Sequence, residues 1–277
     1  MKKWIAIAIC FLCAGCGTQL AYNNADWLVI RYVEGYIDLS SEQKDLIERK
    51  TQVLSQWHRQ HELGLYASQI DVLLSITPKE FSQGDLSSLQ SVVRERSQVF
   101  IQKVAPDIVV LTRSLSDQQV ENFVEAIAKK HQKTADRLNK RTSAESRKAY
   151  AKRIKEAAEE WLGSVTDQQE NVIDLWSQEI IATQAEWIAY QSRLRAEIRK
   201  LLDNRHNPMY FNTHFNQLLY FPENYYSESL KTKRQDNLKL ANKYIVEIIQ
   251  SMNDKQTQHL RKELNSWREI ILDLQQG

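Results

Sequence analysis

The sequence is poor in cysteine, glycine and proline, and each shortage excludes a class of structure. Its three cysteines all lie within the first sixteen residues. The remainder of the chain therefore has neither a disulfide framework nor a thiol nucleophile. Only seven glycines and four prolines occur in 277 residues, which is too few to supply the many turns of a β-rich fold. Few helix breakers, together with abundant Gln, Glu, Lys, Leu and Ala, predict long helices.

The sequence also lacks a long apolar run. The only uncharged stretch near the start, Trp4–Ala14, is about half the roughly 20 residues that a membrane-spanning helix needs. Lys2 and Lys3 precede it and small residues follow it, a pattern typical of a signal peptide. We therefore expect residues 1–15 to be a signal peptide that is cleaved between Gly15 and Cys16.

Cleavage at that point would leave Cys16 as the first residue, with a thiol that can carry diacylglycerol and an amine that can carry palmitate. The run Leu12-Cys13-Ala14-Gly15-Cys16 places small residues directly before the cysteine, although Cys13 stands where leucine is usual. Two or three acyl chains give lasting membrane attachment. Gly17 follows, rather than the Asp that favours inner-membrane retention, so we expect a lipid anchor on the periplasmic face of the outer membrane. The alternatives are an ordinary secreted protein or a buried N-terminal helix.

The net charge of the chain after residue 15 is close to zero, so net charge by itself indicates no class of binding partner. Removal of residues 1–15 takes away Lys2 and Lys3 and leaves 35 basic against 35 acidic residues. The remaining residues 16–277 are sufficient for one large domain. We expect a single all-helical domain, with two halves meeting near residue 163 as the alternative organisation.

A helix-start signal recurs along the chain. An apolar residue is followed by Ser, Thr or Asn and, three positions later, by Gln or Glu, which is the pattern of a capping box. The predicted caps are Ser40, Thr77, Ser116, Thr166 and Asn253. They predict long helices, among them 41–75, 118–141, 167–202 and 254–274, with a further helix over 86–103 that ends before Pro106.

The predicted fold is all-α, an elongated bundle of about eight to ten long helices without a sheet. Residues 108–111 are the only candidate strand and are too short to build one. The first helix, Tyr22–Ile37, is amphipathic, with Trp27 and Arg31 on its polar face. Because that face also carries two acids, we expect the helix to pack into the body rather than lie on a membrane.

Three stretches near the start of the chain are distinctive: Tyr22-Asn23-Asn24-Ala25-Asp26-Trp27-Leu28, then Tyr36-Ile37-Asp38-Leu39, and Trp57-His58-Arg59 with Glu62. They resemble an uncharacterised family of proteobacterial lipoproteins, domain of unknown function 6279. The resemblance implies an all-helical envelope lipoprotein and supplies no catalytic residues. The Leu-Ser-x-x-Gln pattern is also similar to the Leu-Thr-x-x-Gln motif of periplasmic helical stress chaperones, although helix capping alone would require the same residues.

One local cluster has metal-ligand chemistry, formed by His58, His61 and Glu62. Histidines three positions apart share a helix face. However, His61 falls on the apolar stripe between Trp57 and Leu65, and the His-Glu-x-x-His spacing is missing. We therefore predict no metal site, with these three residues as the weak candidates, and expect no cofactor.

The segment 129–155 holds eleven Lys or Arg residues against Asp136 and Glu145. Charge runs on helical hairpins commonly serve solubility, so we expect a solvated face balanced by acids on neighbouring helices. The alternative is contact with lipopolysaccharide phosphates, anionic lipid or an acidic protein. Nucleic acid is not expected as a partner of an exported protein. The candidate patch residues are Lys148, Lys152 and Arg153.

Catalytic signatures are missing from the sequence: it has no Gly-rich phosphate loop and no Gly-x-Ser-x-Gly. The aromatic segment 210–226 is expected to close the helical bundle, and a ligand groove is its alternative role. The leading hypothesis is a non-enzymatic, outer-membrane-anchored periplasmic lipoprotein that acts as a binding or scaffold component of the envelope. A chaperone-like stress factor and a cell-wall or lipid hydrolase are the alternatives.

Overall fold

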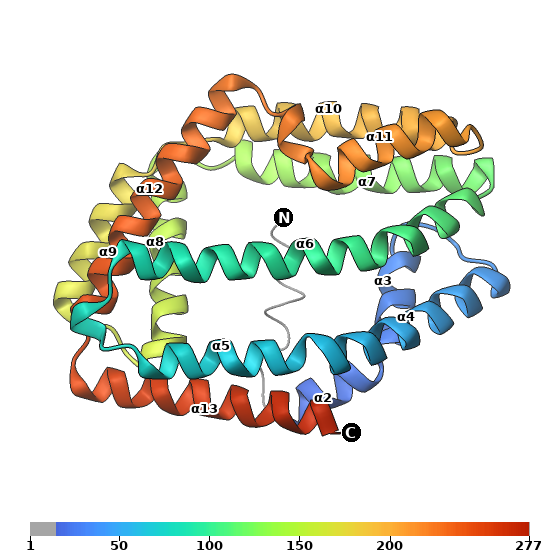
Figure 1. Cartoon of the computed structure of the whole chain (residues 1–277). Coiled ribbons are helices and arrows are strands. Elements are labelled where there is room, and N and C mark those ends of the chain that lie inside the picture. The colour runs from blue at the N-terminus through green and yellow to red at the C-terminus, as the bar shows by residue number, and fades with distance from the viewer. Residues whose placement is uncertain (1–14, 277) are drawn as a thin grey trace. The chain divides into compact units, whose positions relative to one another are not determined.

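The computed structural model describes residues 15–276, and these form twelve α-helices and two short 3-10 helices with no strand. The all-α prediction is confirmed, although the number of helices exceeds the expected eight to ten. Residues 1–14, which hold most of the predicted signal peptide, lie outside the described part. The helices are α2 (Gly15–Asn23), α3 (Ala25–Glu34), α4 (Ser41–His61), α5 (Leu63–Ser75), α6 (Gln83–Arg113), α7 (Asp117–Asn139), α8 (Ser143–Leu162), α9 (Asp167–Glu179), α10 (Gln184–Asp203), α11 (Pro208–Tyr220), α12 (Glu228–Gln250) and α13 (Asp254–Gln276), with η2 (Pro78–Glu80) and η3 (Pro222–Tyr225) (Figure 1).

The chain divides into two units. Unit 1 is built from both ends of the chain, up to Ile76 and from Gln258 onwards, and unit 2 is Thr77–Thr257. Residue 163, near which the sequence suggested a boundary between two halves, lies inside unit 2. None of the helices in residues 15–276 is long and apolar enough to span a bilayer.

In unit 1, α3 packs against α4, and α13 runs beside α5 (Figure 1). Arg268 of α13 donates from Nε to Asp71 Oδ1 of α5 over 2.7 Å. A Cβ atom at Gly64 would come within 3.2 Å of Gln275 Nε2, the end of a flexible side chain on α13. The first predicted helix does pack into the body, as expected, through the face that meets α4.

In unit 2, α7 packs against α10, α8 against α9, and α12 against α9. Aromatic rings fill the contacts between them: Trp176 of α9 stacks on Tyr244 of α12 with ring centroids 6.0 Å apart. Phe211 and Phe215 of α11 are buried with Ala105 and Leu201. The aromatic segment therefore packs into a core, in agreement with its expected role of closing the bundle.

Four of the five predicted helix starts are confirmed. Ser40, Ser116 and Thr166 each accept from the backbone N–H three residues later, and a Gln reaches back to each cap. Asn253 and Gln256 make the same reciprocal pair at the start of α13. The prediction at Thr77 is wrong, because Thr77 makes no side-chain cap bond and only the short η2 follows it.

The helix ends were predicted less well than the starts. The expected helix 41–75 is interrupted at Glu62, and the expected helix 167–202 is interrupted between Ile180 and Thr183. Pro106 lies inside α6 instead of ending it, so residues 108–111 are helical. Gly163, with φ of 76°, ends α8 in the left-handed conformation that glycine adopts without strain.

Candidate functional site

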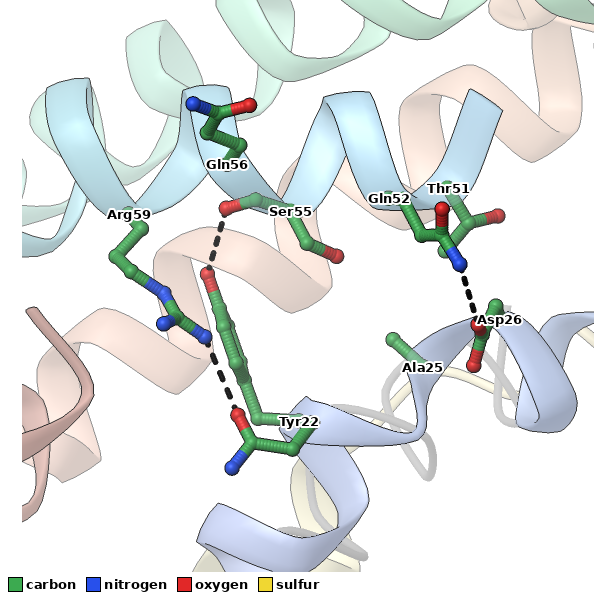
Figure 2. A pocket seen from close by; sticks show the side chains of 9 residues that line it. Tyr22, Ala25, Asp26, Thr51, Gln52, Ser55, Gln56 and Arg59 are labelled. Carbon is green, nitrogen blue, oxygen red and sulfur yellow. Dashed lines mark hydrogen bonds between the residues drawn. The ribbon is translucent and has the colours of Figure 1, made fainter. Parts of the chain in front are cut away.

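A hollow of about 360 Å³ opens between α2–α3 and α4 in unit 1 (Figure 2). Six of its nine lining residues carry an amide or hydroxyl group, and Arg59 and Asp26 are the charged residues in it. The nine lining residues are Tyr22, Asn23, Ala25, Asp26, Thr51, Gln52, Ser55, Gln56 and Arg59. The positions of these residues follow from the packing of α3 on α4.

Tyr22 fixes one end of the hollow through its phenol group. The phenol oxygen lies 3.2 Å from the Ser55 carbonyl oxygen and 3.0 Å from His58 Nδ1. A phenol has a single proton to donate. When that proton goes to the Ser55 carbonyl, His58 must carry its own proton on Nδ1 and donate it to the phenol oxygen. The three residues thus define the tautomer of the imidazole.

Arg59 and Asp26 hold the lining residues in place across the hollow. Arg59 Nη2 donates to Asn23 Oδ1 over 3.2 Å, and its guanidinium lies 5.4 Å from the centre of the Tyr22 ring. At the other end Gln52 Nε2 donates to Asp26 Oδ2 over 3.3 Å. Figure 2 shows these bonds running from α4 to the chain of α2 and α3. Polar contacts therefore join the first described helix to the rest of unit 1.

Burial determines the protonation of the central pair. It raises the pKa of the Tyr22 phenol, against the opposing effect of Arg59, and it lowers the pKa of His58. At neutral pH the phenol therefore keeps its proton and the imidazole is uncharged. This arrangement suits positioning and binding, because neither group is charged or poised as a strong base.

The metal candidates do not converge. His58 faces Tyr22, whereas His61 is exposed and its Nδ1 bonds the Trp57 carbonyl over 3.0 Å. Glu62, at the break between α4 and α5, is only 2 % exposed. The prediction that His61 lies on the buried stripe of its helix is thus wrong. The reason is that Val53 and Leu65 face outward, so the buried stripe of α4 is rotated from the expected one. Within residues 15–276, no three His, Cys, Asp or Glu side chains are grouped so that they could hold a metal ion.

The basic segment forms a hairpin in unit 2, from the end of α7 through the turn at Lys140 into α8. Nine of its eleven Lys and Arg residues are exposed, and Lys130 and Lys155 are half-buried. Lys129, Lys152 and Lys155 pair with carboxylates. In the described chain no carboxylate lies within 4 Å of seven exposed basic residues of the hairpin, which are Lys133, Arg137, Lys140, Arg141, Arg147, Lys148 and Arg153.

The three predicted patch residues differ in how far they are engaged. Lys148 is exposed without an ion pair, and Lys152 lies 3.6 Å from Glu156 in an exposed pair that is worth little. The Arg153 guanidinium lies over the Tyr150 ring, 5.5 Å from its centre. The expectation that neighbouring helices would balance the hairpin is met only at its α9 edge, where Lys155 pairs with Glu170.

Gly15 and Cys16 form the first turn of α2. The predicted cleavage and lipid-attachment positions thus lie directly at the start of the described chain, six residues before Tyr22.

Sequence reasoning missed other polar contacts. Arg205 is buried and donates to the carbonyls of Leu115 and Leu202, each over 3.0 Å, and to Asp117. Asp117 and Leu115 belong to a cap that the sequence did reveal, but no local pattern identifies a cation almost 90 positions away.

The comparisons with known proteins agree with the resemblance carried by Tyr22–Glu62. Residues 35–231 match the family of unknown function DUF6279, and because the match covers well over half of the chain, the protein belongs to this family. No curated protein and no solved structure matches the chain. The α2–α3 side of the hollow precedes the matched segment.

Proposed function

We propose that this DUF6279 protein is an envelope lipoprotein, anchored through acylated Cys16 to the periplasmic face of the outer membrane, that acts as a non-enzymatic binding component. The residues that support the anchor are the small pair Ala14 and Gly15 before Cys16 and the non-acidic Gly17 after it.

The observation that carries the binding role is the α7–α8 hairpin. Seven exposed cationic side chains have no carboxylate within 4 Å in the part of the chain that the structure describes, although residues 16–277 are formally neutral. Phosphate groups of anionic lipid or lipopolysaccharide are the partner chemistry that such a surface favours, at roughly 1 kcal/mol for each basic residue near the membrane surface. An acidic envelope protein is the other partner of matching charge.

The geometry favours binding over the two alternative functions. A hydrolase of glycosidic bonds generally needs two carboxylates facing each other across a cleft. The hollow beside Tyr22 holds one carboxylate, Asp26, and a second hollow in unit 2 holds only Glu186, which pairs with Lys233. A chaperone that holds unfolded chains would require a broad apolar groove, whereas the hollow beside Tyr22 has a volume of only about 360 Å³.

The binding role is tested with the chain from Gly17 onwards, so that the anchor does not contribute. Lys148→Glu/Lys152→Glu/Arg153→Glu should bind vesicles of anionic phospholipid or lipopolysaccharide more weakly than the wild type at low salt, and salt should weaken the wild type too. Lys140→Glu/Arg141→Glu/Arg147→Glu should weaken vesicle binding more, because within residues 15–276 no carboxylate competes with phosphate for these three cations.

The matched control is Lys255→Glu/Arg261→Glu/Lys262→Glu, which makes the same change of charge at exposed positions of α13. If both hairpin variants and this control bind alike, or if the wild type does not bind at all, the hairpin is only a solvated face. Wild-type binding to an acidic envelope protein but not to vesicles would assign the surface to a protein partner.

A further inference from the structure

The outward face of α2 and α3 carries large apolar side chains that nothing in the described chain covers. Leu20 is 67 % exposed and Trp27 is 58 % exposed. Most exposed apolar residues of a protein are scattered singly and carry no meaning. These two differ because they belong to one stripe and because they follow Cys16 so closely.

The stripe follows from the helical register. Asn24 N–H bonds the Leu20 carbonyl over 3.1 Å and Leu28 N–H bonds the Asn24 carbonyl over 3.1 Å, so the turn pattern runs through the junction of α2 and α3. At 100° per residue, Leu20, Asn24, Trp27 and Arg31 fall within an arc of about 60°. All four are exposed. The opposite side, which includes Tyr22 and Tyr32, packs toward α4.

The chemistry of the stripe fits a bilayer interface. Two acids flank the stripe and both are engaged. Asp26 accepts from Gln52, and Glu34 pairs with Lys44 over 2.7 Å and lies 3.9 Å from Arg31. The Arg31 guanidinium lies 6.0 Å from the centre of the Trp27 ring. Tryptophan prefers the headgroup level of a membrane, and arginine extends toward lipid phosphates from an apolar stem.

The short distance from Cys16 to Leu20 and Trp27 indicates that the membrane is what contacts the stripe. Leu20 is one helical turn after Cys16, roughly 6 Å along the axis, and Trp27 is roughly 16 Å along it. An acylated Cys16 would hold its own backbone at the membrane surface. We propose, resting on the lipid anchor proposed above, that α2 and α3 lie on the bilayer with Leu20 and Trp27 in the interfacial layer. The membrane is thus a second contact of the fold beyond the acyl chains, and it sets the orientation of unit 1.

The test uses the full-length acylated protein in vesicles of phosphatidylethanolamine and phosphatidylglycerol whose acyl chains carry bromine, which quenches tryptophan emission over short distances. The emission of Trp27 is the difference between the wild type and Trp27→Phe. This component should be quenched in brominated vesicles and not in unbrominated ones. The control is Trp27→Phe/Leu238→Trp, which moves the reporter to an exposed position on α12 in the other unit and should not be quenched above the background of Trp27→Phe.

A second measurement uses Leu20→Asp/Trp27→Gln and the chain from Gly17 onwards. Its partition into the same vesicles should fall on the order of tenfold or more relative to the wild-type chain. Leu238→Asp should leave the partition unchanged. Two results overturn the inference separately from the anchor: an acylated protein whose Trp27 emission is unquenched, or equal partition of the Leu20/Trp27 variant and the wild-type chain. A wild-type protein without acyl mass overturns the anchor and this inference together.

Discussion

Gln169 and Gln256 bond each other side chain to side chain although they begin different helices. Gln256 Nε2 donates to Gln169 Oε1 over 2.7 Å, and Gln169 Nε2 lies 3.3 Å from Gln256 Oε1. Both amides are fully buried. Each Oε1 also accepts from the backbone of its own cap residue, Thr166 or Asn253. Two capping boxes thus join into one buried polar cluster that ties the start of α9 to the start of α13.

Replacing either glutamine by methionine should destabilise the protein by about 1–3 kcal/mol, because the remaining amide is left buried without its partner. The double variant should cost less than the sum of the two single variants. Denaturant unfolding measures all three. Asp85→Ala is the control, since Asp85 completes a capping box whose two residues are exposed. Strict additivity of the two glutamine variants would contradict the coupling.

Ser116→Ala and Thr166→Ala should each cost on the order of 1 kcal/mol, because each leaves an N-terminal backbone N–H without its cap. Thr77→Ala should leave the unfolding midpoint unchanged, since Thr77 makes no side-chain cap bond. The comparison of the three midpoints is decisive, because the sequence alone gives all three residues the same role. A loss at Thr77 equal to that at Ser116 would show that α-helical capping extends to η2.

Asp117 should make part of the protein's free energy of unfolding depend on pH in the acidic range. The hydrogen bond and the charge of Arg205 hold the pKa of Asp117 below its ordinary value of 3.8. A carboxyl group with a lowered pKa in the fold contributes stability that is fully present above pH 3.8. The contribution is lost as the pH falls through the lower pKa of the folded state. We therefore expect the wild type to exceed Asp117→Asn in stability near neutral pH, and the difference to shrink below about pH 4.

Thermal unfolding of both proteins between pH 2 and pH 7 measures this difference. Glu125→Gln is a suitable control, because Glu125 makes only an exposed pair with Lys129 within its own helix. A difference between wild type and Asp117→Asn that stays constant down to pH 2 would mean that Arg205 does not affect the ionisation of Asp117.

Cys16→Ser should abolish acylation and leave an unprocessed precursor that keeps residues 1–15, because serine offers no thiol for diacylglycerol. Mass spectrometry of the two N-terminal peptides checks it. Cys13→Ser is the matched control and should be processed as the wild type is, since Leu12 precedes Cys13 and small residues do not. Equal acylation of the Cys16→Ser protein would refute the assignment.

Helix starts were predictable because a capping box is local. Each box lies within four consecutive residues, in which the cap side chain accepts from the backbone N–H three positions later. This holds for the boxes that begin at Ser40, Ser116, Thr166 and Asn253. The first helix break was signalled in part, because Gly64 lies two residues after Glu62 and predicts a kink there. The second break was not predictable, since the stretch Ile180–Thr183 holds no glycine or proline. At Ile181 the chain leaves the helix and exchanges two hydrogen bonds with Asn237 of α12, a partner 56 positions away.

The candidate site was partly predictable. The sequence identified His58 and Arg59 among the distinctive residues of unit 1, and it located the basic hairpin correctly. It did not reveal that Tyr22 would bond His58 across 36 positions, which depends on how α2 crosses α4. Nor could periodicity alone show that Leu20 and Trp27 share an open face, because Leu20 precedes the helix that the pattern outlined.

The assembly of unit 1 from both ends of the chain has a consequence for the order of folding. To close over an unfolded segment such as Thr77–Thr257, the ends would have to overcome a loop-closure cost of roughly 5 kcal/mol. Gln250 Nε2 donates to the Phe81 carbonyl over 2.7 Å and brings the two borders of unit 2 together. Once unit 2 has folded, most of this entropy has already been lost. Unit 2 should thus act as a template that delivers α13 to α5, and the end of the chain nearest Cys16 should be the last to become ordered.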